Sequence, residues 1–314
     1  MKRWYRLLFT ATFVLIGCDR TERNLNPTET QTATVPEETA PELTAPKLTA
    51  PEEIVQQTIT FGVVPQFGTK HFAEVWEPLI KRLQIDTGLS IRLIPSSSIP
   101  TFEADFAEGR FDFAYMNPYH YLCAKRDQGY KPLIRDQSKQ LKGILVVRAD
   151  SEIQSVKDLE GKTIAFPAPN ALGASLYMRA LLSRDHQIEF TPRYVNSHDS
   201  VYLNVTTQSS VAGGGVKRTL VSQSTKIQSQ LRIIYETPGV APHPIAYHPR
   251  VSDEIVQRIL QAWIALNDTY DGQELLKQVP MVDPGRAFNE DYLPLEKLAL
   301  EDFYVTPVQE EEDK

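Results

Sequence analysis

Cysteine is scarce in this chain of 314 residues, which contains Cys18 and Cys123 and no others. The two lie far apart, and Cys18 ends an apolar segment with a different predicted use, so Cys123 has no internal disulfide partner. We expect Cys123 to be a small buried apolar side chain. No His/Cys spacing supplies the three or four convergent ligands of a metal site. The sequence therefore predicts neither a disulfide nor a bound metal.

A surplus of positive charge is also missing. The chain has 33 Lys and Arg against 40 Asp and Glu, a formal net charge of −7, and no basic run in its body. Nucleic-acid phosphates are bound by clustered Lys and Arg side chains. We therefore do not expect a nucleic-acid partner.

Sequence signatures of enzymes are absent as well. No GxSxG nucleophile motif occurs, and Gly213-Gly214-Gly215 lies within neither GxGxxG nor GxxxxGK[ST]. We interpret these glycines as a tight turn at the end of a strand. The sequence therefore predicts no catalytic residues and no cofactor, and an enzyme is the less favoured class of function.

The N-terminus is typical of a lipoprotein signal peptide. Its basic residues are Lys2, Arg3 and Arg6. The apolar stretch that follows, residues 7–16, is about ten residues long and thus too short to span a bilayer. It ends in Leu-Ile-Gly-Cys at 15–18, which resembles a bacterial lipobox, although an ordinary signal peptide that contains a Cys is the alternative. We predict a signal peptide over 1–17 and a lipid on Cys18, which would anchor the protein to a membrane without spanning it.

A linker rich in Thr, Pro and Glu follows over residues 18–55. It contains the near-repeat TAPEL, TAPKL, TAPEE over 39–53. Regular prolines prevent helix and sheet, and too few apolar residues are present to form a core. We expect an extended, semi-stiff spacer that holds the body in the periplasm or at the outer face of the cytoplasmic membrane.

The body alternates strand-like and helix-like segments, which is the pattern of an α/β fold. In the first part, the predicted strands 57–65, 89–97 and 111–116 alternate with the predicted helices 76–88 and 101–110. This order favours a mostly parallel sheet with helices on both faces.

The same alternation restarts after residue 155, which indicates a second lobe. We predict a first lobe over 56–148 and 248–314 and a second lobe over 149–247. The chain would cross between them near 147–150 and 242–249, and these crossings would form the hinge.

Polar loops recur where a predicted strand ends or a predicted helix begins. They lie at 63–72, 113–121, 166–182, 196–205, 212–219 and 242–250. Unpaired backbone N–H groups and the helix dipole make a helix start a binding site for anions. Several such loops in one chain predict a small anion gripped from both lobes.

These loops also carry a family resemblance. The strings FPAPNALGAS, SHDSVYLNV, AGGGVKRT and PHPIAYHPRV resemble, in this order, the PhnD-like periplasmic binding proteins. Members of that family are receptors of ABC importers for phosphonate, phosphite or phosphate, and the resemblance covers roughly residues 57–270. It implies a type II periplasmic-binding-protein fold, a phosphorus oxyanion held between two lobes, an importer permease as partner, and a monomer.

The resemblance also implies the ligand contacts. Those of the first lobe are Gly68, Thr69, Lys70, His71, Tyr115 and Asn117. Those of the second lobe are Asn170, Gly173, Ala174, Ser175, Ser197, His198 and Asp199. Where the best-known phosphonate receptors have a Ser-Thr-Ser-Gly cluster, residues 170–175 of this chain carry fewer hydroxyls, so the identity of the oxyanion stays open.

Each of these contacts has a structural alternative. Ser175 begins a predicted helix and can donate to the anion or simply cap the helix. The imidazole of His198, followed by Asp199, can donate to the anion while a carboxylate or a carbonyl fixes its tautomer, or it can be a satisfied loop histidine. Lys70 can be solvated, and Tyr115 can belong to the core. We expect neutral donors in the site rather than many Arg side chains, because the ligand has to be released to a transporter.

The leading interpretation is a solute-binding lipoprotein that captures a phosphorus oxyanion and passes it to an ABC importer. A sensory receptor of the same fold, which signals to a membrane kinase or chemoreceptor, is the alternative. His243 and His248 flank the second predicted crossing and, with the prolines around them, we interpret them as part of a stiff hinge.

Overall fold

The computed structural model describes residues 58–66 and 69–306, with the side chains of 69–71 excepted. The predictions for the signal peptide over 1–17, for Cys18, for the linker and for Gly68 lie outside the described residues. In the part of the chain that is described, no helix has both the length and the apolar character needed to cross a membrane.

The first lobe is built on a mixed sheet in the order β11-β4-β10-β3-β1-β2. Its strands are β1 (Ile59–Val63), β2 (Ile91–Pro95), β3 (Phe113–Tyr115), β4 (Lys131–Asp136), β10 (Ile245–Tyr247) and β11 (Pro284–Arg286). Its helices are α1 (Thr69–Thr87), α2 (Ile99–Ala107), α3 (Pro118–Gln128), α8 (Asp253–Ala265), α9 (Tyr270–Gln278) and α10 (Leu293–Glu296). Strands β1, β2 and β3 are parallel, whereas β10, β4 and β11 add antiparallel pairs.

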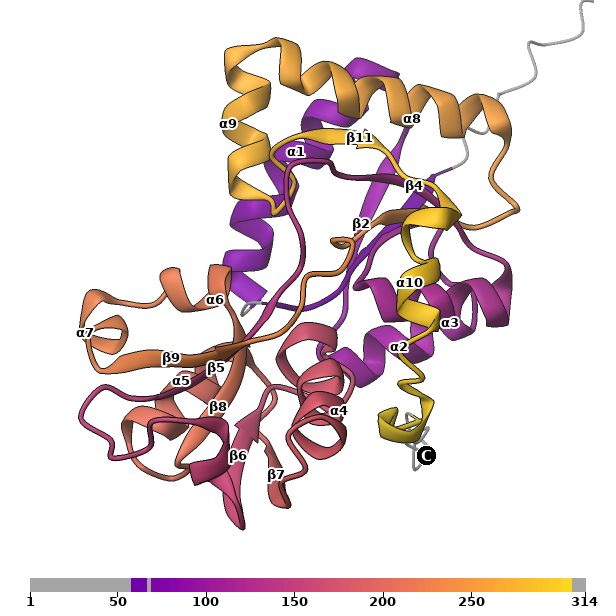
Figure 1. Ribbon diagram of the computed structural model, residues 1–314. Coiled ribbons are helices and arrows are strands. Elements are labelled where there is room, and N and C mark those ends of the chain that lie inside the picture. Colours follow the sequence, from indigo (N-terminus) through magenta and orange to yellow (C-terminus); the bar gives the residue numbers. More distant parts are fainter. Residues whose placement is uncertain (1–57, 67–68, 307–314) are drawn as a thin grey trace, which may run out of the picture. The chain divides into compact units, whose positions relative to one another are not determined.

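The second lobe is built on a sheet in the order β7-β6-β8-β5-β9. Its strands are β5 (Gly143–Arg148), β6 (Lys162–Phe166), β7 (Phe190–Tyr194), β8 (Ala212–Val216) and β9 (Leu231–Glu236). Its helices are α4 (Tyr177–Arg184), α5 (His198–Thr206), α6 (Lys217–Val221) and α7 (Thr225–Gln228), and a π-helical turn (Leu172–Leu176) leads directly into α4. Figure 1 shows the elements of the two sheets in separate groups.

The structure moves both predicted crossings and makes both sheets mixed. Strand β5 was predicted to belong to the first lobe, but it pairs with β8 and β9. Strand β10 was predicted to belong to the second lobe, but it pairs with β3 and β4. The chain therefore crosses between sheets at about 137–142 and 237–244, and Leu141 pairs with Val240 there. The apolar run 143–148 predicts a buried strand but not the sheet to which the strand belongs, because pairing depends on partners far away in the sequence.

Helix α8 illustrates why the first lobe holds together. The side chain of Ser252 caps its first turn by accepting from the Ile255 N–H. One face of the helix is apolar and buried, and its Trp263 stacks on Phe61 of β1 with ring centroids 6.0 Å apart. Helices α8 and α9 thereby lie beside α1, as Figure 1 shows.

Glycines in β5 and β8 allow the π-helical turn to pack directly onto the second sheet. A Cβ atom on Gly214 would overlap the carbonyl oxygen of Ala174, and one on Gly143 would overlap that of Gly173. These positions therefore require glycine because two backbones touch. The run 213–215 is thus the interior of a strand, and the predicted tight turn is wrong.

Residues 298–305, which we call the C-terminal strap, lie against α4 of the second lobe. Arg184 donates to the carbonyls of Leu298 and Ala299 at 2.9 and 2.7 Å. Arg179 donates to the carbonyl of Phe303 at 2.7 Å. The sequence placed this segment in the first lobe, but its contacts tie it to the second lobe as well.

Candidate ligand-binding site

A narrow cavity of about 30 Å³, the central cavity, lies where the two lobes meet. It is lined by Val64, Pro65, Gln66, Ile99, Asn117, Leu141, Ala171, Leu172, Gly173, Ala174, His198, Val216 and His243. Gln66 also lines two larger cavities. One of about 390 Å³ is lined by Ser96, Ser97, Ser98 and Ser197 among others, and we call it the serine cavity. The other, of about 610 Å³, is lined by Lys139, Lys142, Lys217 and Arg218 among others, and we call it the cationic cavity.

The start of the helical segment 172–184 forms one wall of the central cavity. Among the described residues, the backbone N–H groups of Leu172, Gly173 and Ala174 have no hydrogen-bond partner, whereas that of Ser175 bonds to the Ala171 carbonyl at 2.7 Å. These free donors stand at the positive end of the helix dipole. The wall therefore has the free donors that an anion-binding site needs, and the predicted contacts Gly173 and Ala174 lie in it.

His198 forms the facing wall of the second lobe. It is the first residue of α5, which is capped by Ser197 through a 3.1 Å bond from the Ser200 N–H. Its Nδ1 lies 3.3 Å from the hydroxyl of Thr219, and Nε2 has no partner in the described part of the chain. Burial lowers the pKa of His198 to about 4, so the ring is neutral at pH 7.

The neutral ring of His198 can meet a ligand oxygen in two ways. When Thr219 donates to Nδ1, the proton of the ring is on Nε2, which then donates to an anionic oxygen. When Nδ1 donates to Thr219, Nε2 accepts from a protonated oxygen of the ligand. The sequence predicted Asp199 as the group that sets this tautomer, but the carboxylate of Asp199 accepts instead from Gln223 at 2.6 Å.

Gln66, His243 and Tyr115 form the wall of the first lobe. The ring of His243 stacks on that of Tyr115 with centroids 5.2 Å apart, and its Nε2 lies 3.1 Å from the amide nitrogen of Gln66. Burial lowers the pKa of His243 to about 3, with smaller contributions in the same direction from His120 and His198. The neutral ring therefore accepts from Gln66 and fixes its amide at the junction of the cavities. The sequence interpreted His243 only as a hinge residue, although it lies in one of the polar loops.

Asn117 and Asn170 connect the lobes, and the side-chain amide of Asn170 is fully used by these contacts. The side chain of Asn117 caps α3 by accepting from the His120 N–H at 2.8 Å, and it donates to the Asn170 carbonyl at 3.2 Å. The amide of Asn170 donates to Glu103 at 3.1 Å and to the Val305 carbonyl at 2.7 Å, and it accepts from the Val305 N–H at 3.0 Å. Asn170 is therefore a latch between the second lobe, α2 and the strap, which corrects its predicted role as a ligand contact.

Ser175 also has a role other than the predicted one. Its side chain is fully buried, accepts from Arg179 at 3.2 Å and lines none of the cavities described above. Ser197 and Asp199 line the serine cavity, at the edge of the central cavity rather than in it. The side chains of Thr69, Lys70 and His71 are outside the described set, so their predicted contacts stay predictions.

The cationic cavity departs most from the sequence analysis, which expected neutral donors. Among the described residues, it is lined by Lys139, Lys142, Lys217 and Arg218 and by one carboxylate, that of Glu236. Tyr115 also lines it, and burial raises the pKa of that phenol. Arg218 lies in the polar loop 212–219, so its presence near the ligand could have been predicted. The sequence does not show which way its side chain points.

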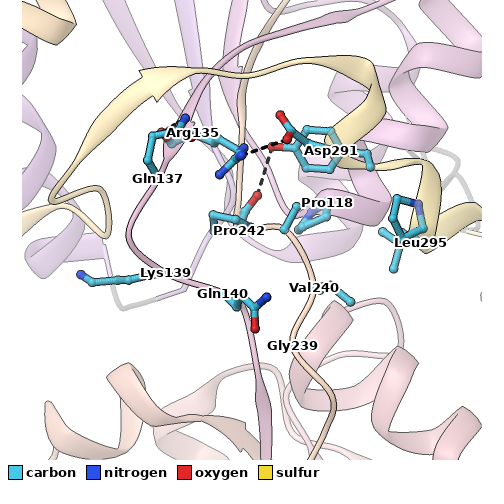
Figure 2. A pocket seen from close by; sticks show the side chains of 13 residues that line it. Pro118, Arg135, Gln137, Lys139, Gln140, Gly239, Val240, Pro242, Asp291 and Leu295 are labelled. Carbon is cyan, nitrogen blue, oxygen red and sulfur yellow. Dashed lines mark hydrogen bonds and ion pairs between the residues drawn. The ribbon is translucent and has the colours of Figure 1, made fainter.

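A further cavity of about 400 Å³, which we call the hinge cavity, lies beside the crossings (Figure 2). The guanidinium of Arg135, which lines this cavity, pairs with the carboxylate of Asp291 at 2.9 Å. The hydroxyl of Tyr292 donates to the Pro242 carbonyl at 3.2 Å. The charge of Arg135 is thus compensated by a carboxylate, and the other cation in the lining is Lys139, which the cavity shares with the cationic cavity.

Comparisons with known proteins agree on one class. Residues 61–292 match the family described as "ABC transporter, phosphonate, periplasmic substrate-binding protein". A curated relative is the "Phosphate-import protein PhnD" of Mycolicibacterium smegmatis, 23% identical over 231 residues, which cover 65% of this chain and 70% of that protein.

Solved structures show the same fold. A binding protein component of an ABC phosphonate transporter from Pseudomonas aeruginosa has a TM-score of 0.71 at 15% identity, with 81% of this chain and 90% of that one covered. PhnD1 from Prochlorococcus marinus, in complex with methylphosphonate, has a TM-score of 0.72 at 16% identity, with 79% and 99% covered. The predicted α/β, type II periplasmic-binding-protein fold is confirmed.

Proposed function

Since the chain belongs to the family of periplasmic substrate-binding proteins of phosphonate ABC transporters, we propose that it captures a phosphorus oxyanion in the central cavity and delivers it to an ABC importer. The observation that carries this proposal is the set of free N–H groups at Leu172, Gly173 and Ala174 facing the neutral ring of His198. These groups together can donate to several oxygens of one tetrahedral anion.

The arrangement also accounts for reversible capture. The donors of the second lobe are backbone amides and an uncharged imidazole, and Gln66 of the first lobe supplies a neutral amide. Such donors hold an anion through hydrogen bonds and a helix dipole rather than through a buried ion pair. A cavity of about 30 Å³ has room for little more than one water, so the lobes have to separate before a phosphorus oxyanion enters or leaves.

The ligands named for two relatives support the same chemical class. One solved relative holds methylphosphonate, and a curated relative is named for the import of phosphate. The ligand of this chain is accordingly a phosphate, phosphite or phosphonate, bound by a monomer without a cofactor.

We further propose that a lipid on Cys18 anchors the protein at the outer face of the cytoplasmic membrane. The lipobox-like residues 15–18 support this anchor. The variant Cys18→Ser is expected to leave the membrane fraction, and retention of the variant after mild washing would contradict it.

Isothermal titration calorimetry of the mature protein tests the ligand class. The panel is phosphate, phosphite, methylphosphonate and 2-aminoethylphosphonate, with sulfate, glutamate and glucose as controls. At least one phosphorus compound is expected to bind more tightly than every control. Tight binding of glutamate or glucose without binding of any phosphorus compound would overturn the proposed function.

A further inference from the structure

The cationic cavity is continuous in its lining with the proposed oxyanion site. Gln66, Leu141, Val216 and His243 line both the central and the cationic cavity. The cationic cavity measures about 610 Å³, which is within the range of pockets that hold small organic ligands. A substituent on a phosphorus atom in the central cavity therefore has a space to enter.

Arg218 and Tyr115 present unused polar groups to that space. The guanidinium of Arg218 is half-buried and donates to the carbonyl of Gln278, but no carboxylate lies within ion-pair distance of it among the described residues. Burial of Arg218 lowers its pKa, and Tyr115 opposes that effect. Tyr115 is only 2% exposed, and its hydroxyl has no hydrogen-bond partner in the described structure.

The positive charges around Arg218 outnumber the carboxylates, since Glu236 lines the cavity together with Lys139, Lys142 and Lys217. Lys139 lies 3.8 Å from Asp136, whereas the described ion pairs include none for Lys142 or Lys217. The hinge cavity is a contrast within the same molecule, because its Arg135 is neutralised by Asp291. A half-buried cation without a partner is costly unless an anion joins it.

We propose that the cationic cavity receives a second anionic group of the ligand, so that the preferred ligand is a phosphorus oxyanion with a carboxylate a few carbons away. This inference rests on the proposed function and specifies its ligand. Arg218 binds the carboxylate, the hydroxyl of Tyr115 donates to it, and the lysines at the rim contribute a favourable field. An ammonium group in the same place is repelled, so 2-aminoethylphosphonate is a poor ligand.

Calorimetric titration of the mature protein with ligands of matched length tests this preference. The ligands are 3-phosphonopropionate, propylphosphonate, whose substituent is uncharged, and 2-aminoethylphosphonate, whose substituent carries an ammonium group. We expect 3-phosphonopropionate to bind at least tenfold more tightly than propylphosphonate, and 2-aminoethylphosphonate to bind more weakly than propylphosphonate. Equal affinities for 3-phosphonopropionate and propylphosphonate would overturn the inference.

Variants locate the effect in the cavity. Arg218→Gln keeps a donor for the Gln278 carbonyl but removes the charge, and it is expected to reduce the tenfold preference to less than threefold. The matched control is Arg193→Gln, because Arg193 of β7 also donates to a backbone carbonyl, that of Ser209 at 2.8 Å, and lines none of the described cavities. The control is expected to keep the preference.

The remaining outcomes separate the two proposals. A preference that persists in Arg218→Gln places the carboxylate elsewhere and overturns the inference. If that variant does not fold, the double variant Lys142→Gln, Lys217→Gln is expected to narrow the preference instead, and an unchanged preference there counts against the inference. Binding of propylphosphonate without any carboxylate preference leaves the proposed function intact, whereas binding of no phosphorus compound refutes both.

Discussion

His198 and Ser175 were predicted to act alike, as donors to the ligand, and the structure separates them. His198 lines the central cavity with Nε2 free, whereas Ser175 is buried against Arg179. The variant His198→Ala is therefore expected to weaken binding of methylphosphonate about ten- to hundredfold, since a hydrogen bond to a charged group contributes about 1.5–3 kcal/mol. Ser175→Ala is expected to lower the melting temperature instead. Calorimetry and thermal unfolding of both variants check this, and a large loss of affinity in Ser175→Ala would contradict it.

The buried histidines also predict a dependence of stability on pH. Burial lowers the pKa of His198 to about 4 and that of His243 to about 3, below the ordinary value of 6.5. Between pH 6.5 and 4 the unfolded chain thus binds protons that the folded protein does not, so the free energy of unfolding falls as the pH falls. His243→Gln is expected to have a shallower decrease over this window in urea unfolding series. Parallel curves for wild type and variant would show that His243 is not buried in neutral form.

Residue types and their approximate places could be predicted from the sequence, but several roles could not. His198, Gly173 and Ala174 line the central cavity because local signals, a helix start and a following loop, determine their positions. The partner of His243 is Gln66, which is 177 positions away. Nothing in either local sequence indicates that contact, and the same holds for Arg218.

At the scale of helices and strands, the latch at Asn170 joins the start of the segment 172–184 to α2 and the strap. Asn170→Ala would leave a carboxylate oxygen of Glu103 and both backbone groups of Val305 without their partner. The buried carboxylate oxygen of Glu103 costs about 1–3 kcal/mol when it loses its hydrogen bond, whereas Val305 is 45% exposed and its backbone groups can bond to water instead. We therefore expect the free energy of unfolding of Asn170→Ala, from urea titration, to fall by about 1–3 kcal/mol.

A matched control for the latch is Asn204→Ala. Asn204 makes a single bond within α5, to the Ser200 carbonyl at 2.8 Å, so its loss is expected to cost much less. Equal losses in the two variants would show that Asn170 is not a latch.

Element types could be predicted better than sheet membership. The predicted strands 57–65, 89–97 and 111–116 contain β1, β2 and β3, and the predicted helix 101–110 overlaps α2. Residues 143–148 were placed in the first lobe, but they pair with β8 and β9 of the second lobe. Hydrophobic periodicity reports that a segment is buried, and it carries no information on which sheet buries it.

For the whole molecule, the contacts between the lobes predict a ligand-driven closure. The proposed ligand donors lie on both lobes, so binding is expected to favour the closed arrangement by the difference in affinity between the two arrangements. Ligand at about one hundred times Kd is expected to add roughly 2.7 kcal/mol to stability. Small-angle X-ray scattering is expected to show a smaller radius of gyration with methylphosphonate than without it. An unchanged radius at saturation would argue against closure around the ligand.

The family and the fold could be predicted from the order of several short motifs, and the comparisons confirm both. The lobe boundaries could be predicted only in part. The crossing at about 137–142 contains neither proline nor glycine, whereas the crossing at about 237–244 contains Pro238, Gly239, Pro242 and Pro244 and overlaps the predicted crossing 242–249. The physical reason is that a hinge is defined by the sheets on either side of it rather than by its own residues.

The strap has a consequence for recombination between relatives of this protein. Residues 143–237 look like a module that a gene fusion could exchange at the two crossings, yet α4 in that module depends on residues 298–305 through Arg179 and Arg184. A chimera that takes only 143–237 from a donor pairs those arginines with a foreign C-terminal segment. Successful exchanges, in evolution or in sensor engineering, must therefore transfer the C-terminal segment together with the central one.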